Sequence, residues 1–149
     1  MNSTPFHIQE RVRWIDCDGA RIIYYGAYVR FFEIAETEMY RSIGLPYVVA
    51  FQTIDGFPVR AAYHCEYYSP ARLDDLMDID IWVSHWGTTS YIIGFEFARA
   101  ETGERLAGGY CRIVMVDLID KRPIPIPDIL RDGLARYTQE GRVSVKNTA

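Results

Sequence analysis

The sequence has few cysteines, few histidines and no excess of basic charge, and each shortage excludes a class of protein. It holds three cysteines, none in a CxxC pair, and three histidines. Neither a zinc-binding spacing nor a disulfide framework is therefore present, and we expect no metal and no cofactor. Reduced thiols favour a cytoplasmic location. The formal net charge of −4 argues against a nucleic-acid partner.

Long apolar runs and internal repeats are also missing. No stretch approaches the ~20 apolar residues that span a bilayer, and the N-terminus lacks the basic segment and apolar core of a signal peptide. We therefore expect no membrane segment. The length fits one domain over residues 1–149, with a polar tail from about residue 139 that we expect to be loosely ordered.

One long helix is predicted over residues 26–42. Its apolar residues recur at helical spacing, as Tyr28, Phe31, Phe32, Ala35, Met39 and Ile43. Gly44 can end the helix and Pro46 prevents its resumption.

Strands are predicted where apolar residues alternate, over residues 6–14, 59–67, 77–84, 90–100 and 106–116. In the second segment, the alternation places Tyr63 on one face and Arg60 and His64 on the other. A short helix is predicted to begin at Asp128. One helix and five strands make an α+β domain. Because one helix covers only one sheet face, we expect at least a homodimer.

The segment "WIDCDGARIIYYGAYVRFFE", residues 14–33, places two aspartates around a cysteine just before an aromatic run. The flanking carboxylates disfavour Cys17 as a nucleophile, because they raise the pKa of its thiol. Asp16 and Asp18 could share a hard cation, but no third acidic residue lies within the segment to complete its coordination.

A third interpretation uses the helix that follows. Asp18 precedes the helix start near Tyr25 by seven residues, and free N–H groups at a helix N-terminus can polarise a carbonyl oxygen. A carboxylate there could attack that carbonyl or activate a water. A thioester suits this arrangement, because its thiol leaving group has a pKa of roughly 8.5. Alternatively, Asp16 and Asp18 only form an Asx turn, and spacing leaves both interpretations open.

The run "DCDGARIIYYGAYVRFFEIAE" resembles the motif of the 4-hydroxybenzoyl-CoA thioesterase family, and "YYSPARLDD" and "RPIPIP" resemble later family segments. The resemblance spans residues 6–130. It implies a hot-dog fold, in which a curved five-stranded antiparallel sheet wraps around one long central helix. It also implies an acyl-CoA substrate and a homodimer, often doubled to a homotetramer, with sites at the subunit interface.

Within this resemblance, Asp18 matches the catalytic carboxylate and Tyr25 the position whose N–H polarises the thioester. Glu33 matches an acidic helix position that is an aspartate near the ring hydroxyl in the hydroxybenzoyl enzyme. Arg21 replaces a usual glycine, so the local backbone is expected to differ. Ala27 replaces a frequent asparagine or serine.

Other substrate-binding candidates each have a simpler structural explanation. They are Tyr24, Tyr28, Phe32, His64 and Arg72. Aromatic residues at helical spacing commonly belong to the core, and His64 could pair across the sheet with Glu66. The hairpin at residues 87–89 lacks the basic residues that hold the CoA phosphates in the hydroxybenzoyl enzyme. Arg72, Lys121 and Arg122 are then the candidates, although such side chains are commonly just solvated.

Three functions follow from these residues. The first is an acyl-CoA thioesterase, with Asp18 as nucleophile or general base. The second is a hot-dog dehydratase that acts on hydroxyacyl thioesters. The resemblance for those enzymes is a histidine and an acidic residue on the helix, and this helix has no histidine, which argues against this function. The third is a non-catalytic acyl-CoA-binding module, which would bind its ligand without releasing free thiol.

Overall fold

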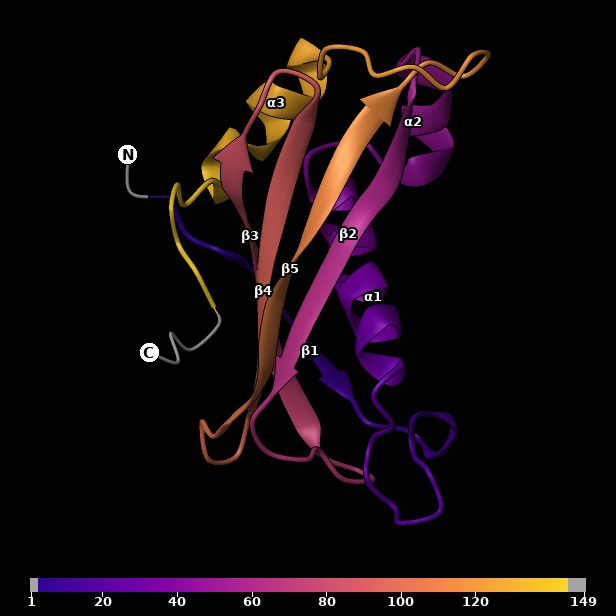
Figure 1. Ribbon diagram of the computed structural model, residues 1–149. Helices are drawn as coiled ribbons and strands as arrows, with labels where there is room; N and C mark the ends of the chain where they lie inside the picture. The colour runs from indigo at the N-terminus through magenta and orange to yellow at the C-terminus, as the bar shows by residue number, and fades with distance from the viewer. Residues whose placement is uncertain (1–2, 145–149) are drawn as a thin grey trace.

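The structure, a computed structural model, describes residues 3–144 (Figure 1). Its longer elements are β1 (Phe6–Arg11), α1 (Ala27–Ser42), α2 (Tyr47–Thr53), β2 (Phe57–Tyr67), β3 (Leu76–Trp86), β4 (Ser90–Arg99), β5 (Arg105–Val116) and α3 (Asp128–Leu134). Two short 3₁₀ turns, η1 (Trp14–Asp16) and η2 (Ala135–Tyr137), complete them. Among these residues, no helix has the length and apolar composition of a membrane span.

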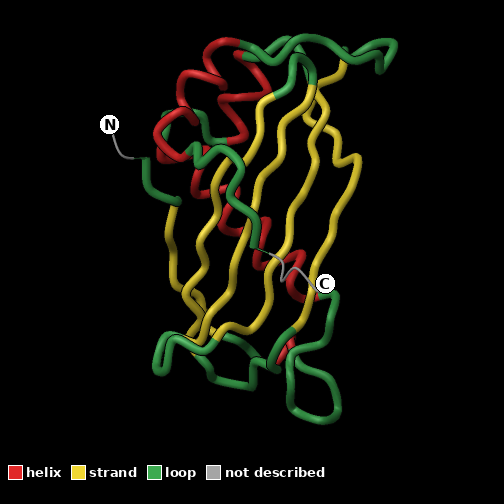
Figure 2. Tube along the Cα trace, turned by 60° about the vertical axis from the view of Figure 1, so that its left-hand side comes forward, coloured by secondary structure: helices red, strands yellow, loops and turns green. Residues whose placement is uncertain are grey.

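The five strands form one antiparallel sheet in the order β1-β3-β4-β5-β2, so that β1 and β2 are its edges. The sheet curves around α1, which lies along one face (Figures 1 and 2). The predicted α+β architecture of five antiparallel strands and one long helix is confirmed.

Aromatic side chains join α1 to the sheet. The ring of Tyr28 lies 5.3 Å from that of Phe97, and Phe32 lies 5.3 Å from Phe95. Phe31, Ala35 and Met39 on the same helix are fully buried. Because each large apolar side chain contributes about 1.5–3 kcal/mol when buried, this contact is the main stabilising interface of the fold.

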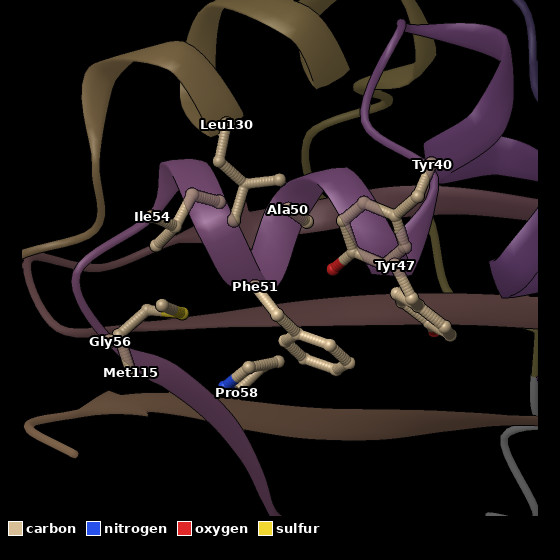
Figure 3. Close-up of a pocket in the computed structure, with 9 residues that line it drawn as sticks. All are labelled: Tyr40, Tyr47, Ala50, Phe51, Ile54, Gly56, Pro58, Met115 and Leu130. Atoms are coloured by element: carbon tan, nitrogen blue, oxygen red, sulfur yellow. The ribbon is translucent and has the colours of Figure 1, made fainter.

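Helix α2 was not predicted from the sequence, because its seven residues are too few for a clear helical period. It packs between the end of α1, the start of β2 and α3. Figure 3 shows Phe51 of α2 close to Pro58 of β2, with Tyr40 of α1 and Leu130 of α3 on the other sides of a small cavity.

Strand β2 carries a bulge that changes which face its residues occupy. The register shifts between Arg60 and Ala62, so Arg60 pairs with Ile113 and Tyr63 with Cys111. Ile113 and Cys111 share the buried face of β5. Both Arg60 and Tyr63 therefore face α1, and the predicted placement of Arg60 on the opposite face is wrong, since a bulge shifts the alternation by one residue.

The segment after η2 runs across the other face of the sheet, opposite α1 (Figure 2). The guanidinium of Arg142 lies 3.8 Å from the ring centroid of Trp82, and Ser144 Oγ donates to the Gly109 carbonyl at 3.0 Å. Residues 139–144, the start of the tail that is expected to be loosely ordered, therefore contact this face of the sheet. Its remainder, residues 145–149, lies outside the described residues.

Candidate active site

The segment between η1 and α1 is a narrow loop closed by its own backbone. Cys17 and Ile23 form an isolated antiparallel bridge, Asp18 N–H donates to the Ile22 carbonyl at 2.9 Å, and Tyr24 N–H donates to the Asp16 carbonyl at 3.0 Å. Arg21 has a φ of 64°, in the left-handed region that favours glycine. Position 21, where the family motif has a glycine, thus has a left-handed backbone although the residue is arginine.

Asp16 fastens this loop to the first turn of α1. Its side chain is buried, with 1% exposure. Oδ1 accepts from Arg30 Nη2 at 2.6 Å and Nε at 3.0 Å, while Oδ2 accepts from the Arg13 N–H at 2.8 Å. Because Arg30 lies in α1, this charge-assisted contact fixes where the loop stands relative to the helix N-terminus.

Asp18 lies on the exposed side of the same loop. Its Oδ1 accepts from the Ala20 N–H at 2.8 Å, which is an Asx turn. Its Oδ2 accepts no hydrogen bond within residues 3–144. The Asx turn and a chemically available carboxylate oxygen therefore coexist, and the turn holds the side chain in place.

The start of α1 offers backbone donors. The N–H groups of Tyr25 and Gly26 donate to no group in the described part of the chain. Tyr67 donates its hydroxyl to the Tyr25 carbonyl at 3.3 Å, which ties this turn to β2. A Cβ at position 26 would lie 2.8 Å from the Tyr24 ring, so any other residue there would require this partly exposed ring to move. The helix dipole adds positive potential at these donors.

Cys17 lies beside both aspartates. Partial burial raises the pKa of its thiol, and the carboxylates of Asp16, Asp18 and Asp74 raise it further. The predicted direction of this shift is confirmed, and the thiol stays protonated near neutral pH.

The structure gathers only some of the other predicted site residues around this loop. Tyr28 and Phe32 are buried against the sheet, while Tyr24 is 43% exposed beside Gly26. Glu33 is exposed on α1 and lines a cleft next to β2. Arg72 forms an isolated bridge with Ile22, so its segment runs along the loop.

His64 lies on the other face of the sheet. Its ring stacks on Tyr110 at 5.4 Å and its Nε2 lies 3.4 Å from Glu66, so the structure does not bring it to the loop. Lys121 and Arg122 follow β5, at the end of the sheet away from residue 18 (Figure 1). Within one chain they are far from Asp18.

Sequence reasoning missed two residues that shape the site, Arg30 and Tyr67. Arg30 is fourteen positions from Asp16 and no motif connects them. The alternation in β2 could have indicated Tyr67, because it follows Tyr63 by four residues, two full strand periods, and so shares its face. Across residues 3–144, no group of three or more His, Cys, Asp or Glu side chains is arranged to hold a metal ion.

Comparison with known proteins defines the class. The profile of the thioesterase-like superfamily matches residues 12–134, and the chain belongs to this family. The family resemblance expected from the loop and helix motif is confirmed.

Individual relatives narrow the comparison. Acyl-CoA thioester hydrolase YbgC of Escherichia coli O6:H1 is 32% identical over 127 residues, which covers 85% of this chain and 93% of that protein. The 4-hydroxybenzoyl-CoA thioesterase of Pseudomonas sp. is 25% identical over 99 residues, 64% of this chain and 70% of that protein. The structure of Slr0204, a 1,4-dihydroxy-2-naphthoyl-CoA thioesterase from Synechocystis, superimposes with a TM-score of 0.82 at 18% identity, covering 87% and 95% of the two chains. This likeness confirms the hot-dog fold.

Replacing Asp16 by alanine tests the attachment of the loop. We expect Asp16→Ala to lower the free energy of unfolding by about 2 kcal/mol, because it removes three hydrogen bonds to a buried carboxylate. Urea denaturation measures this change. Asp18→Ala is the matched control and should cost less than about 1 kcal/mol, since its carboxylate is exposed. Equal losses in the two variants would contradict the role assigned to Asp16.

Cys17 offers a second test, through its reactivity. A raised pKa leaves less thiolate at neutral pH, so we expect iodoacetamide to modify Cys17 at pH 7.5 at least about threefold more slowly than free cysteine. Mass spectrometry of the peptide containing Cys17 gives the rate. Asp18→Asn should speed the reaction by removing one neighbouring negative charge. Modification as fast as that of free cysteine would contradict this electrostatic account.

Proposed function

We propose that the protein hydrolyses acyl-CoA thioesters to the free acid and CoA. In this reaction Asp18 acts as nucleophile or general base, and the Tyr25 N–H polarises the thioester carbonyl. One observation carries the proposal: two N–H donors without acceptors, those of Tyr25 and Gly26, lie at the start of α1 next to the loop that carries the Asp18 carboxylate. The hydrogen bonds between Asp16 and Arg30 attach this loop to the same turn of the helix. The names of the curated relatives, which are thioester hydrolases acting on CoA esters, support it.

The chemistry follows from these groups. The carbonyl oxygen accepts a hydrogen bond from the Tyr25 N–H, which stabilises negative charge on that oxygen as the carbonyl carbon is attacked. The Asp18 carboxylate either attacks this carbon directly or removes a proton from an attacking water. CoA then leaves as a thiolate, so no strong general acid is needed. Attack by water gives the free acid directly, whereas attack by Asp18 gives a mixed anhydride that water then hydrolyses to the free acid and the Asp18 carboxylate. The aromatic residues around the helix start would keep bulk water away from the reacting carbon.

Replacing Asp18 by asparagine is the central test. Asp18→Asn removes the nucleophilic or basic oxygen but keeps the shape of the side chain, so kcat should fall by at least about 10³-fold. The rate is measured as release of free thiol from aryl-, short-, medium- and long-chain CoA esters. Circular dichroism and light scattering confirm that fold and oligomer are unchanged.

The outcomes of this assay separate the candidate functions. Near-full activity of Asp18→Asn on every cleaved ester would refute the mechanism. Saturable binding of CoA esters by the unaltered protein, without any thiol release, would instead favour a binding module. Reversible hydration of an enoyl thioester without hydrolysis would favour a dehydratase.

We further propose that the chain forms a homodimer through β2, and that two such dimers associate into a tetramer. β2 is a free edge of eleven residues, and Phe57 and Val59 on it are 42% and 40% exposed. Val29 of α1 and Phe51 of α2, exposed at 47% and 51%, extend this apolar surface. An uncovered edge with such side chains favours pairing with a second copy.

A cytoplasmic location, favoured by three free thiols, stays a prediction.

Size measurement tests the assembly. Size-exclusion chromatography with light scattering should give a mass at least twice that of one chain. Val59→Glu should shift the population toward the single-chain mass, because a like charge would be brought opposite itself across the paired edges. Tyr110→Glu, on the sheet face turned away from α1, is the control for this dimer contact. A monomer mass for the unaltered chain would contradict the proposal.

A further inference from the structure

A cleft of about 540 Å³ opens between α1, α2 and β2. Its walls are mostly apolar, with Phe32 on the inner side. The other apolar lining residues, Val29, Phe51, Phe57 and Val59, belong to the surface proposed above for the dimer contact, so a second copy would close the outer side of the cleft. A cleft of this size and lining suits a hydrocarbon or aromatic group. It also contains charged side chains, which a site for plain hydrocarbon would not need.

The cleft opens on the side of α1 that leads to the helix start, because Val29, which lines it, lies one helical turn after Tyr25. Beneath this side, α1 packs on β2: the ring of Tyr28 lies 5.2 Å from Tyr67, and that of Phe32 lies 6.3 Å from Tyr63. One turn further, Glu36 is ion-paired with Arg60. The N–H donors at Tyr25 and this ion pair therefore lie along one side of α1, with Val29 between them.

The ion pair has unused hydrogen-bonding capacity. Glu36 is fully buried, and its Oε1 accepts from Arg60 and, at 2.7 Å, from the Tyr47 hydroxyl. Its Oε2 has no partner among the described residues. The Tyr63 hydroxyl, with only the Cys65 thiol beside it, likewise finds no oxygen or nitrogen partner in residues 3–144. A buried polar atom without a partner costs about 1–3 kcal/mol, so a group that supplies the missing bonds is favoured here.

The charges around the cleft select the kind of group. Burial raises the pKa of Glu36, while the adjacent Arg60 opposes this shift. A ligand carboxylate would meet Glu36 and Glu33, and a ligand ammonium would meet Arg60. A hydroxyl is neutral, donates to Glu36 and accepts from Arg60.

Distance sets where the hydroxyl must stand on the substrate. Tyr25 and Glu36 are eleven positions apart, which is about 16 Å at 1.5 Å per helical residue. A benzoyl group is much shorter than this span. An extended chain advances about 1.2 Å per bond, so an acyl chain of about twelve carbons reaches from the thioester carbonyl to Glu36.

We propose that this cleft receives the far end of a medium- to long-chain acyl group that carries a hydroxyl near its terminus, bound between Glu36 and Arg60 beside Tyr63. The inference rests on the thioesterase function proposed above, since that function places the thioester at Tyr25. It assigns to the cleft a preference that a purely apolar acyl pocket would not have.

Matched substrates test the proposal. The ratio of kcat/KM for 12-hydroxydodecanoyl-CoA to that for dodecanoyl-CoA should be about tenfold in the unaltered enzyme, as expected for a hydrogen bond to a charged group. Tyr63→Phe should lower this ratio about threefold, because it removes one hydroxyl that has no structural partner. Tyr110→Phe, which removes a hydroxyl from the opposite sheet face, should leave the ratio unchanged.

A double variant addresses the ion pair without leaving one charge buried alone. Glu36→Met combined with Arg60→Met replaces both charged side chains by apolar ones, a change that is often tolerated. It should bring the ratio to about one while the enzyme still cleaves dodecanoyl-CoA. The corresponding ratio for 4-hydroxybenzoyl-CoA to benzoyl-CoA should not change, because these groups are too short to reach Glu36.

The contrary outcomes are equally defined. A ratio at or below one in the unaltered enzyme, or a tenfold ratio that survives in both variants, would overturn the inference and leave ordered water as the occupant of the cleft. A change in the benzoyl ratio would overturn the placement of the hydroxyl.

The two proposals fail separately. If no CoA ester releases thiol, the thioesterase proposal fails. Calorimetry of 12-hydroxydodecanoate against dodecanoate then tests the cleft alone, and about tenfold tighter binding of the hydroxy acid would support it. Equal binding of the two acids would overturn it.

Discussion

The contact between α1 and the curved sheet is the interaction on which the rest of the structure depends. Tyr28 and Phe32 pack there on Phe97 and Phe95, and Phe31 of the same helix is fully buried. Because the strands wrap around this one helix, the helix N-terminus is held at one end of the sheet, with its dipole pointing out of the core. The loop that carries Asp18 needs only a local attachment to this fixed point, and the bonds from Asp16 to Arg30 and Arg13 supply it.

Much of this arrangement could be predicted from the sequence, because it depends on local periodicity. The helical spacing of α1 and the alternation in the strands gave the α+β architecture, and the motif around Asp18 gave the loop before the helix. The pairing of Asp16 with Arg30 could not be predicted in the same way. It joins residues fourteen positions apart and depends on how the loop folds back, which no periodic pattern records.

The errors have equally specific causes. The bulge at Arg60 and Ala62 breaks a regular alternation by one residue, and the residue types around it contain no sign of the break. The contacts of residues 139–144 could not be predicted either, because composition does not indicate their backbone hydrogen bonds to β3 or the packing of Arg142 on Trp82. At Arg21 the residue type was misleading instead. Arginine disfavours the left-handed conformation, but the bridge between Cys17 and Ile23 on either side of it fixes the turn.

The bulge in β2 links the fold to the substrate preference proposed above. Without it, Arg60 would face the other side of the sheet, and Glu36 would be a buried carboxylate with only Tyr47 as partner. Replacing a buried ion pair by apolar side chains of similar volume is often neutral or stabilising, so stability alone does not explain why the cleft contains one. A pair that leaves Oε2 without a partner is less stable still. Its retention in a cleft otherwise lined by aromatic and aliphatic side chains is therefore better explained by recognition of a polar group than by the folding of the chain.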